Sequence, residues 1–273
     1  MDINKDIKIA LLPLDIVWAD REANIAKVAD ALSRLDADTD LVVLPELFST
    51  GFSADPDLLG ELAETNGGPT MAVVRELARR HNVAIAGGFL ARTGASLYNR
   101  AFFIEPSGEE TFYDKRHLFV ISAESKFFTP GDKEPPIIRY RGWNFALIVC
   151  YDLRFPVWCR NVDNRYDALV SPANWPTARK YAWHHLIIAR GIENQAYVVG
   201  ADRGGSDEYG EYDGMAMSVD YTGKELDAES RDGFIYSRLQ RKPLDDFRAK
   251  YPFSADGDAF AIDNMIVGTN KQL

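Results

Sequence analysis

Short apolar runs alternate along this chain with amphipathic stretches of helical period, and this alternation constrains the fold more than any other feature. Residues 8–14 have the pattern of a buried strand, and Asp20 is suited to cap a helix whose apolar positions recur every three or four residues. Strand-like runs return at 41–44 and 83–90, with a predicted helix over 69–81 between them. Strands alternating with helices of this length are typical of layered α/β domains.

The second half of the chain repeats this layout. We expect strands over 137–140, 144–150, 168–172 and 197–202, and a helix over 180–194 with Trp183, Leu186, Ile187 and Arg190 on one face. In the first half, two antiparallel strands, 99–105 and 110–115, are expected around a turn at Pro106. No internal sequence repeat is visible. With 273 residues, of which 46% are hydrophobic, the chain can bury a large core, so we predict a single domain over residues 1–273.

Net charge and the amino-terminal sequence argue against several classes of partner. The formal net charge of −10 argues against nucleic-acid binding, because contacts with phosphate rely on clustered Lys and Arg. Residues Met1 to Asp6 lack the basic and apolar regions of a signal peptide, and no apolar stretch approaches the length that spans a bilayer. We therefore expect a cytoplasmic protein that acts on small molecules, with no nucleic-acid or membrane partner.

Cysteine and histidine usage limits the redox and metal chemistry. Only Cys150 and Cys159 occur, which indicates free thiols in a reducing compartment, and Cys159 beside Trp158 is expected to pack in the core. The four histidines (His81, His117, His184 and His185) form no ligand set at a recognised spacing, so we predict no metal and no cofactor. Gly204, Gly205 and Gly210 lie in an acidic loop with no helix start after it, which is not a phosphate-binding pattern.

Three chemically active side chains follow predicted strands. Cys150 comes at the end of the run 145–149, Glu46 follows Pro45 after the run 41–44, and Lys115 follows an aromatic run. Taken singly, each has a structural interpretation: a packed thiol, a solvated loop carboxylate and half of a surface ion pair. Because open α/β sheets bind ligands at the carboxyl ends of strands, the three together indicate a nucleophile with a base and a cation.

The segments around these residues resemble the three catalytic signatures of the nitrilase superfamily of carbon-nitrogen hydrolases, in the family's order. They are Pro45–Glu46, Tyr113–Leu118 and Val149–Pro156, and the resemblance continues through Ser171–Pro176 and Ala189–Tyr197, covering about Lys8 to Leu239. The most similar branch is the ω-amidases, which hydrolyse the terminal amide of 2-oxo acids such as 2-oxoglutaramate and 2-oxosuccinamate.

The resemblance implies a fold and an assembly. Members of the superfamily are four-layer α-β-β-α sandwiches that pack helix to helix as homodimers or higher homo-oligomers, and their carboxyl-terminal segment often joins the partner subunit. In this chain that segment starts at about Tyr251. Its sequence has no strong periodicity, so a loosely ordered tail is the alternative.

The resemblance also assigns roles to residues. Glu46 is expected to take the proton from Cys150, which attacks the amide carbon and leaves a thioester for water to hydrolyse. Lys115 and the backbone N–H of Tyr151 are the candidate oxyanion donors. A second glutamate of related amidases corresponds to Glu124, which would position the substrate or orient Lys115. The alternative for Glu124 is an exposed loop residue paired with Lys126.

Aromatic and polar residues near these segments suggest the substrate pocket. Phe119, Phe127, Phe128, Tyr151 and Trp175 are the candidate aromatic walls, and Asn174 with Trp175 follows another strand end. Arg154 is the nearest candidate cation for a substrate carboxylate, with Arg179 and Arg203 in reserve, although Arg154 could instead pair with a carboxylate of its own loop.

Three functions remain open from the sequence. The first is an ω-amidase, and the second is another enzyme of the superfamily, such as a nitrilase or an N-carbamoyl amide hydrolase, with the same Glu-Lys-Cys triad. The third is a catalytically silent scaffold of the same fold, which would have no need of Glu46, Lys115 and Cys150 at three strand ends.

Overall fold

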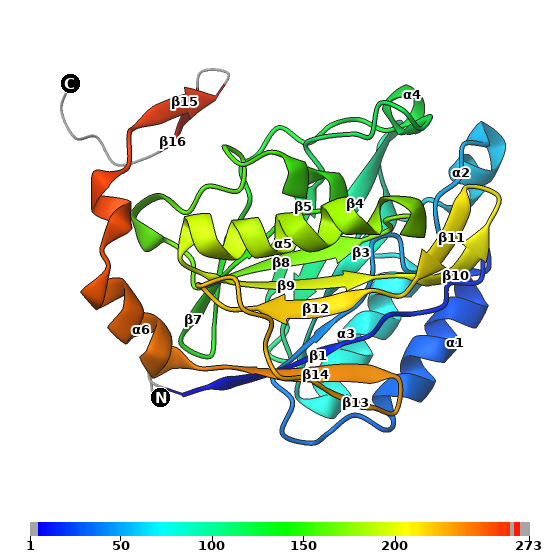
Figure 1. Ribbon diagram of the computed structural model, residues 1–273. Coiled ribbons are helices and arrows are strands. Elements are labelled where there is room, and N and C mark those ends of the chain that lie inside the picture. Colours follow the sequence, from blue (N-terminus) through cyan, green and yellow to red (C-terminus); the bar gives the residue numbers. More distant parts are fainter. Residues whose placement is uncertain (1–4, 263–264, 268–273) are drawn as a thin grey trace.

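Two β-sheets pack face to face and carry helices on their outer faces, as the computed structural model shows (Figure 1). The structure describes residues 5–262 and 265–267. The first sheet has the order β13-β14-β1-β2-β3-β4-β5, built from β1 (Ile7–Leu11), β2 (Leu41–Val43), β3 (Ala84–Thr93), β4 (Ser96–Ile104), β5 (Glu110–Asp114), β13 (Glu229–Arg231) and β14 (Phe234–Leu239). The second has the order β12-β9-β8-β7-β6, built from β6 (Ile137–Tyr140), β7 (Trp143–Leu147), β8 (Ala168–Ala173), β9 (Tyr197–Asp202) and β12 (Ala216–Val219).

Helices and two hairpins complete the described chain. The α-helices are α1 (Arg21–Leu32), α2 (Pro56–Leu62), α3 (Pro69–His81), α4 (Glu124–Phe127), α5 (Lys180–Asn194) and α6 (Arg241–Lys250). Short 3-10 helices are η1 (Cys150–Arg154), η2 (Val162–Asn164), η3 (Thr177–Arg179) and η4 (Phe253–Asp256). The hairpins are β10 (Gly204–Asp207) with β11 (Gly210–Asp213), and β15 (Phe260–Ile262) with β16 (Met265–Val267).

The layers follow from the alternation of side chains along the central strands. Strands β1, β2 and β3 run parallel, as do β7, β8 and β9. Neighbouring residues of β2 face opposite sides: Val43 belongs to the cluster between the two sheets, whereas Val42 belongs to the cluster under α1 and α3. Trp183 and Ile187 of α5 pack on the second sheet. The predicted four-layer α-β-β-α sandwich is therefore confirmed.

The expected helix boundaries are also found. The side chain of Asp20 accepts a hydrogen bond of 2.9 Å from the backbone N–H of Ala23 and so caps α1. Helix α3 begins at Pro69 and ends before Asn82, which adopts a left-handed backbone conformation. Helix α5 has the predicted bounds, although Leu186 is only half-buried.

Two predictions about local structure were wrong. The strand expected over 144–150 ends at Leu147, and Cys150 instead opens the 3-10 helix η1. The glycines at 204, 205 and 210 do not lie in an open loop but in the hairpin β10–β11, which backbone pairing forms with little apolar burial. Alternating apolar residues reveal strands that line a core, so this hairpin gave no such signal.

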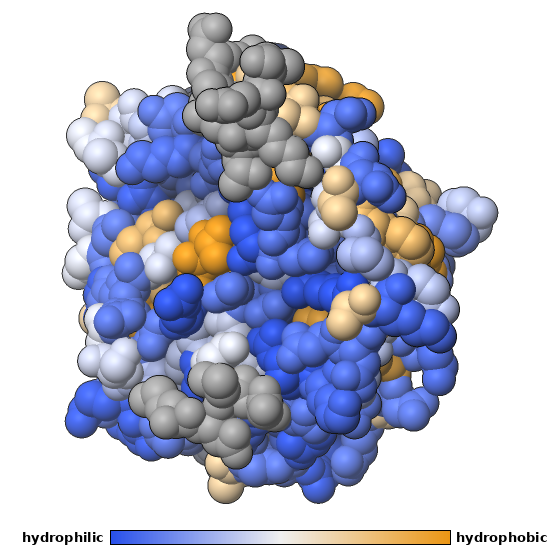
Figure 2. Space-filling view, turned by 90° about the vertical axis from the view of Figure 1, so that its left-hand side faces the viewer, coloured by the Kyte–Doolittle hydropathy of each residue, from blue (hydrophilic) through white to orange (hydrophobic). Residues whose placement is uncertain are grey.

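The described part of the segment after α6 begins with contacts between aromatic rings. The rings of Tyr251 and Phe253 stack with their centroids 5.8 Å apart, and η4 and the hairpin β15–β16 follow. The rest of the predicted interface segment, residues 263–264 and 268–273, lies outside the described residues. The face of the molecule toward α6 is mostly hydrophilic, with apolar residues in small separate areas (Figure 2). Within the described ranges, none of the helices has the length and apolarity to cross a bilayer.

Candidate active site

The three predicted catalytic side chains come from loops that follow β2, β5 and β7, so both sheets contribute to one pocket. Its cavity has a volume of about 260 Å³. The lining includes the candidates Glu46, Lys115, Glu124, Cys150, Phe119, Tyr151, Arg154, Asn174 and Trp175. The backbone N–H of Glu46 donates to the carbonyl of Ala173 on β8 over 3.2 Å, which ties the first sheet's loop to the second sheet.

Lys115 lies between two carboxylates. Its Nζ atom is 2.8 Å from Glu46 Oε1 and 2.9 and 3.1 Å from the two oxygens of Glu124. The three side chains are at most 3% exposed. Burial pushes the pKa of Lys115 down, but the charges of Glu124, Glu46 and Cys150 more than offset it, so the pKa lies well above its usual range. Lys115 therefore stays an ammonium group at neutral pH.

Glu124 is a buried member of the site and not an exposed partner of Lys126. It opens α4, and its Oε2 atom accepts a hydrogen bond of 2.6 Å from the backbone N–H of Phe119. The pocket-facing loop of Phe119 is thereby tied to the same carboxylate that contacts Lys115. The alternative stated for Glu124 from the sequence is wrong.

Asn99 on β4 also lines the pocket, and the sequence analysis did not select it. Its Nδ2 atom lies 2.6 Å from Glu46 Oε1 and 2.8 Å from Glu124 Oε1, and its Oδ1 atom is buried with no hydrogen-bond partner among the described residues. The available signal was an amide in a strand of otherwise mostly apolar inward-facing residues. Such a buried amide requires hydrogen-bond partners, and here they are the two glutamates.

Cys150 is held in a strained turn beside Glu46. Its φ angle is +45°, in the left-handed region that non-glycine residues seldom adopt, and its side chain is 6% exposed. Burial raises the pKa of the thiol well above its usual range. The charge of Glu46 and a hydrogen bond with it raise the pKa further, while Lys115 and the backbone N–H of Asn174 oppose this. At neutral pH the resting thiol is protonated and needs a base.

Asp152 anchors the turn that carries Cys150 and was also missed from the sequence. One carboxylate oxygen accepts hydrogen bonds from the Tyr113 hydroxyl at 2.8 Å and from the backbone N–H of Val149 at 3.2 Å. The other accepts from the backbone N–H of His117 at 2.9 Å and contacts its Nδ1 at 2.8 Å. Because His117 lies two residues after Lys115, Asp152 fixes the lysine segment and the cysteine turn relative to each other.

Two guanidinium groups lie at the pocket over aromatic rings. Arg154 lies 4.9 Å from the ring centroid of Trp175, and Arg179 lies 4.9 Å from that of Phe119. Among the described residues neither has a carboxylate partner, so the ion pair considered for Arg154 is not found. Arg203 is fully buried and paired with Asp207, which removes it as a reserve.

Asn174 presents unpaired polar atoms to the pocket. Both Nδ2 and Oδ1 of its amide are buried and lack a partner among the described residues. The next residue is fixed, because the backbone N–H of Trp175 donates to Asp202 Oδ1 over 2.7 Å. A small polar ligand would satisfy the amide of Asn174.

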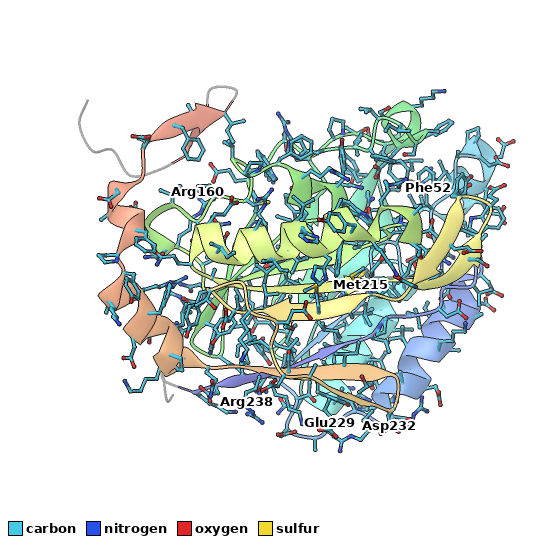
Figure 3. All side chains as sticks on the ribbon, in the orientation of Figure 1. Phe52, Arg160, Met215, Glu229, Asp232 and Arg238 are labelled. Carbon is cyan, nitrogen blue, oxygen red and sulfur yellow. The ribbon has the colours of Figure 1, made fainter. Side chains whose placement is uncertain are left out.

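The outer wall consists of residues that the sequence did not indicate. Phe52, Tyr209 and Tyr212 line the cavity, and the rings of Phe52 and Tyr209 meet edge to face at 4.9 Å. Figure 3 shows Phe52 at the end of the molecule where α2, α4 and the hairpin β10–β11 come together. Phe127 and Phe128, expected as pocket walls, do not line the cavity. They pack in the apolar cluster behind Phe52, whose ring stacks on that of Phe128 at 6.4 Å.

Cys150 and Cys159 are both free thiols, and Cys159 packs in the apolar core. Cys159 is 2% exposed, and burial raises the pKa of its thiol to about 12. No group of three or more His, Cys, Asp or Glu side chains in the described ranges is placed to hold a metal ion.

Comparisons with known proteins agree on one family. The family model described as carbon-nitrogen hydrolase matches residues 8–248. The omega-amidase YafV of Escherichia coli K12 is 37% identical over 94% of this chain and 98% of its own length. The 2-oxoglutaramate amidase of Bacillus subtilis is 30% identical over 91% and 96%.

Solved structures give the same result. A CN-hydrolase superfamily protein from Xanthomonas campestris, with an arsenic adduct in its active site, has a TM-score of 0.89 at 34% identity and covers 94% of this chain and 99% of its own. Nit3 of Saccharomyces cerevisiae, a member of branch 10 of the nitrilase superfamily, has a TM-score of 0.80 at 27% identity over 92% and 97%.

Proposed function

Since the chain belongs to the carbon-nitrogen hydrolase family and is a hydrolase of amides, we propose that it releases ammonia from the terminal amide of a small 2-oxo acid. The observation that carries the proposal is the pairing of a buried Glu46-Lys115-Cys150 group with two guanidiniums at the same pocket. The names of the relatives, omega-amidase and 2-oxoglutaramate amidase, support the same substrate class.

In the proposed first step, Glu46 takes the proton of the Cys150 thiol while the sulfur attacks the amide carbon. The raised pKa of the thiol requires such a base, and Glu46 is a carboxylate at the same cavity whose charge acts on that thiol. The carbonyl oxygen becomes an oxyanion, for which Lys115 and the backbone N–H of Tyr151 are the proposed donors. One such donor contributes about 10²–10³ in kcat.

In the second step the carbon-nitrogen bond breaks. Glu46 returns the proton to the departing nitrogen, ammonia leaves, and the acyl group remains on Cys150 as a thioester. Glu46 then takes a proton from water, which attacks the thioester carbonyl and releases the carboxylic acid and the thiol. Because Lys115 is held as an ammonium by two carboxylates, it is suited to stabilising charge and not to accepting a proton.

The far end of the substrate is assigned to the cations of the pocket. A 2-oxo acid amide carries a carboxylate at the end opposite the amide, and Arg154 and Arg179 offer guanidiniums without acidic partners of their own in the described chain. Asn174 offers a donor and an acceptor to the polar atoms in between. The cavity of about 260 Å³ suits a small acid of this kind.

The testing experiment measures ammonia release from 2-oxoglutaramate, 2-oxosuccinamate, glutamine, a simple nitrile and an N-carbamoyl amino acid, with Cys150→Ala as the blank. We expect the 2-oxo amides to give the highest kcat/KM and the blank to give none. Arg154→Gln and Arg179→Gln should raise KM for the 2-oxo amides at least tenfold. Activity confined to the nitrile or the carbamoyl compound would show that the proposed substrate class is wrong. No activity on any compound would favour a catalytically silent scaffold.

We also propose a homodimer or higher homo-oligomer in the cytoplasm. Tyr181 and Ile192 of α5 are 75% and 52% exposed, so this helix would offer apolar side chains to a second copy packed against it, as the family resemblance implies. Light scattering coupled to size-exclusion chromatography measures the mass directly. A monomer at micromolar concentration would contradict the assembly.

A further inference from the structure

We propose that Asn99 is a positioning residue of the reaction: it joins Glu46 to Glu124 and leaves Glu46 Oε2 as the oxygen that exchanges the proton with Cys150. The proposal rests on the role proposed above for Glu46. Asn99 is 1% exposed and lines the same cavity as Cys150.

The contacts form a closed ring of two donors and two acceptors. Lys115 Nζ and Asn99 Nδ2 each lie 2.6–2.9 Å from the same two oxygens, Glu46 Oε1 and Glu124 Oε1. An amide nitrogen has two hydrogens, so Asn99 uses both of them here. Two buried carboxylates repel each other, and Lys115 alone supplies a single positive charge between them. The two N–H groups of Asn99 are the second contribution that holds the carboxylates together.

The orientation of the amide follows from this charge arrangement. The reverse orientation would turn Oδ1 toward two carboxylate oxygens, which is repulsive, so Nδ2 must face them. Oδ1 is left buried without a partner in the described chain, a cost that the two charge-assisted hydrogen bonds offset. The backbone is fixed as well, since the N–H of Lys115 donates to the Asn99 carbonyl over 2.9 Å.

The ring distinguishes the two oxygens of Glu46. Both side-chain donors bind Oε1, and no N–H of the described residues donates to Oε2. An oxygen that accepts two hydrogen bonds from N–H groups holds a proton less well than its free neighbour. Oε2 is therefore the oxygen left free to exchange the proton, and the two bonds at Oε1 hold the carboxylate in one orientation.

The rate of alkylation of Cys150 by iodoacetamide tests the inference independently of any substrate, because the reaction needs only the thiol and its base. The step forms a carbon-sulfur bond, expels iodide and passes the thiol proton to Glu46. Asn99→Asp keeps the shape of the side chain but replaces the donors with a third carboxyl group. We expect the alkylation rate at pH 7.5 to fall at least 30-fold, measured by intact mass.

The pH dependence separates this role from a structural one. Acid should slow alkylation of the wild type but should protonate the new carboxyl of Asn99→Asp, which then can donate a hydrogen bond. The ratio of variant to wild-type rate should therefore rise at least fivefold between pH 7.5 and 5.5. Asn99→Ala, which removes the donors without adding charge, should lose at least tenfold at both pH values.

A matched substitution controls for the burial of a new carboxyl group. Asn161 is also buried, and its Nδ2 donates to the carbonyls of Tyr166 and Asn194 away from the pocket. Asn161→Asp should melt at a lower temperature yet alkylate within twofold of the wild type. The inference would be overturned if both Asn99 variants were alkylated at the wild-type rate. It would also be overturned if the ratio of the Asn99→Asp rate to the wild-type rate did not change between pH 7.5 and 5.5. If the Asn99 effects hold but no 2-oxo amide is hydrolysed, only the proposed substrate fails.

Discussion

At the scale of single residues, the resting thiol of Cys150 sets the pH behaviour of the site. Burial and the charge of Glu46 hold its pKa well above the usual value of about 8.5, so the thiol stays protonated at neutral pH. We predict no thiolate absorbance at 240 nm from Cys150 below about pH 8.5, taken as the difference between the wild type and Cys150→Ala.

Replacing Glu46 should make the Cys150 thiol easier to ionise and yet abolish hydrolysis. Glu46→Gln removes a negative charge that raises the pKa of the Cys150 thiol and leaves Lys115, which lowers it. Thiolate absorbance should thus appear at lower pH than in the wild type, while hydrolysis is lost for want of a base. A wild-type thiolate already present at pH 7 would mean that Lys115, and not Glu46, activates the thiol.

Glu124 is predicted to matter for turnover and for stability. Glu124→Ala leaves the buried ammonium of Lys115 with one carboxylate instead of two, which should cost about 3 kcal/mol in unfolding free energy. We expect kcat to fall about 10²-fold while the thioester still forms on Cys150, as detected by rapid quenching and mass measurement. Lys126→Ala, an exposed neighbour, is the control, and unchanged kinetics in Glu124→Ala would refute the role.

At the scale of secondary-structure elements, strand β3 controls where Glu46 lies. A Cβ atom at Gly88 would come within 3.2 Å of the Glu46 Cα atom and 3.3 Å of the Leu47 nitrogen, and both are backbone atoms that cannot turn aside. The two segments are joined by hydrogen bonds from Gly88 N–H to the Pro45 carbonyl and from Phe48 N–H to the Gly88 carbonyl.

We therefore predict that Gly88→Ala shifts the Glu46 turn by a few tenths of an ångström and lowers kcat about tenfold or more. Steady-state kinetics with 2-oxoglutaramate, or the alkylation rate, provides the readout. Gly60→Ala in α2 is the matched control, because nothing lies within 4 Å of the added Cβ. It should leave kcat unchanged and raise the unfolding free energy by up to about 1 kcal/mol. Equal kinetics for the two variants would contradict the close packing.

At the scale of the whole molecule, the site depends on the contact between the two sheets. Phe103 of β4 lies 5.7 Å, between ring centroids, from both Tyr140 and Phe145 of the second sheet. Glu46 and Lys115 come from the first sheet and Cys150 from the second, so loss of this contact should separate the base from the nucleophile.

Phe103→Ala is predicted to lower the unfolding free energy by about 3–5 kcal/mol, the cost of emptying a buried aromatic site. Far-UV circular dichroism and residual activity should be lost over the same temperature range, since both sheets share one core. Phe253→Ala, at a 58% exposed position, should change stability by less than about 0.5 kcal/mol. Activity lost well before the circular dichroism signal would show that the sheets separate first.

The sequence by itself determined the elements and the family. The apolar period and the start at Pro69 predicted α3, and the run before Pro45 predicted β2, because these signals depend on residues only a few positions apart. The motifs around Glu46, Lys115 and Cys150 identified the superfamily, and the family match over residues 8–248 agrees.

Only the tertiary structure decided how these parts meet. Asn99 contacts Glu46 and Glu124 across separations of 53 and 25 residues, and the bond between Tyr113 and Asp152 spans 39. Such contacts depend on the order of strands in each sheet and on how the sheets stack, which no local pattern encodes. For the same reason, only the folded chain showed that Arg154 lies over the ring of Trp175 and has no carboxylate partner among the described residues.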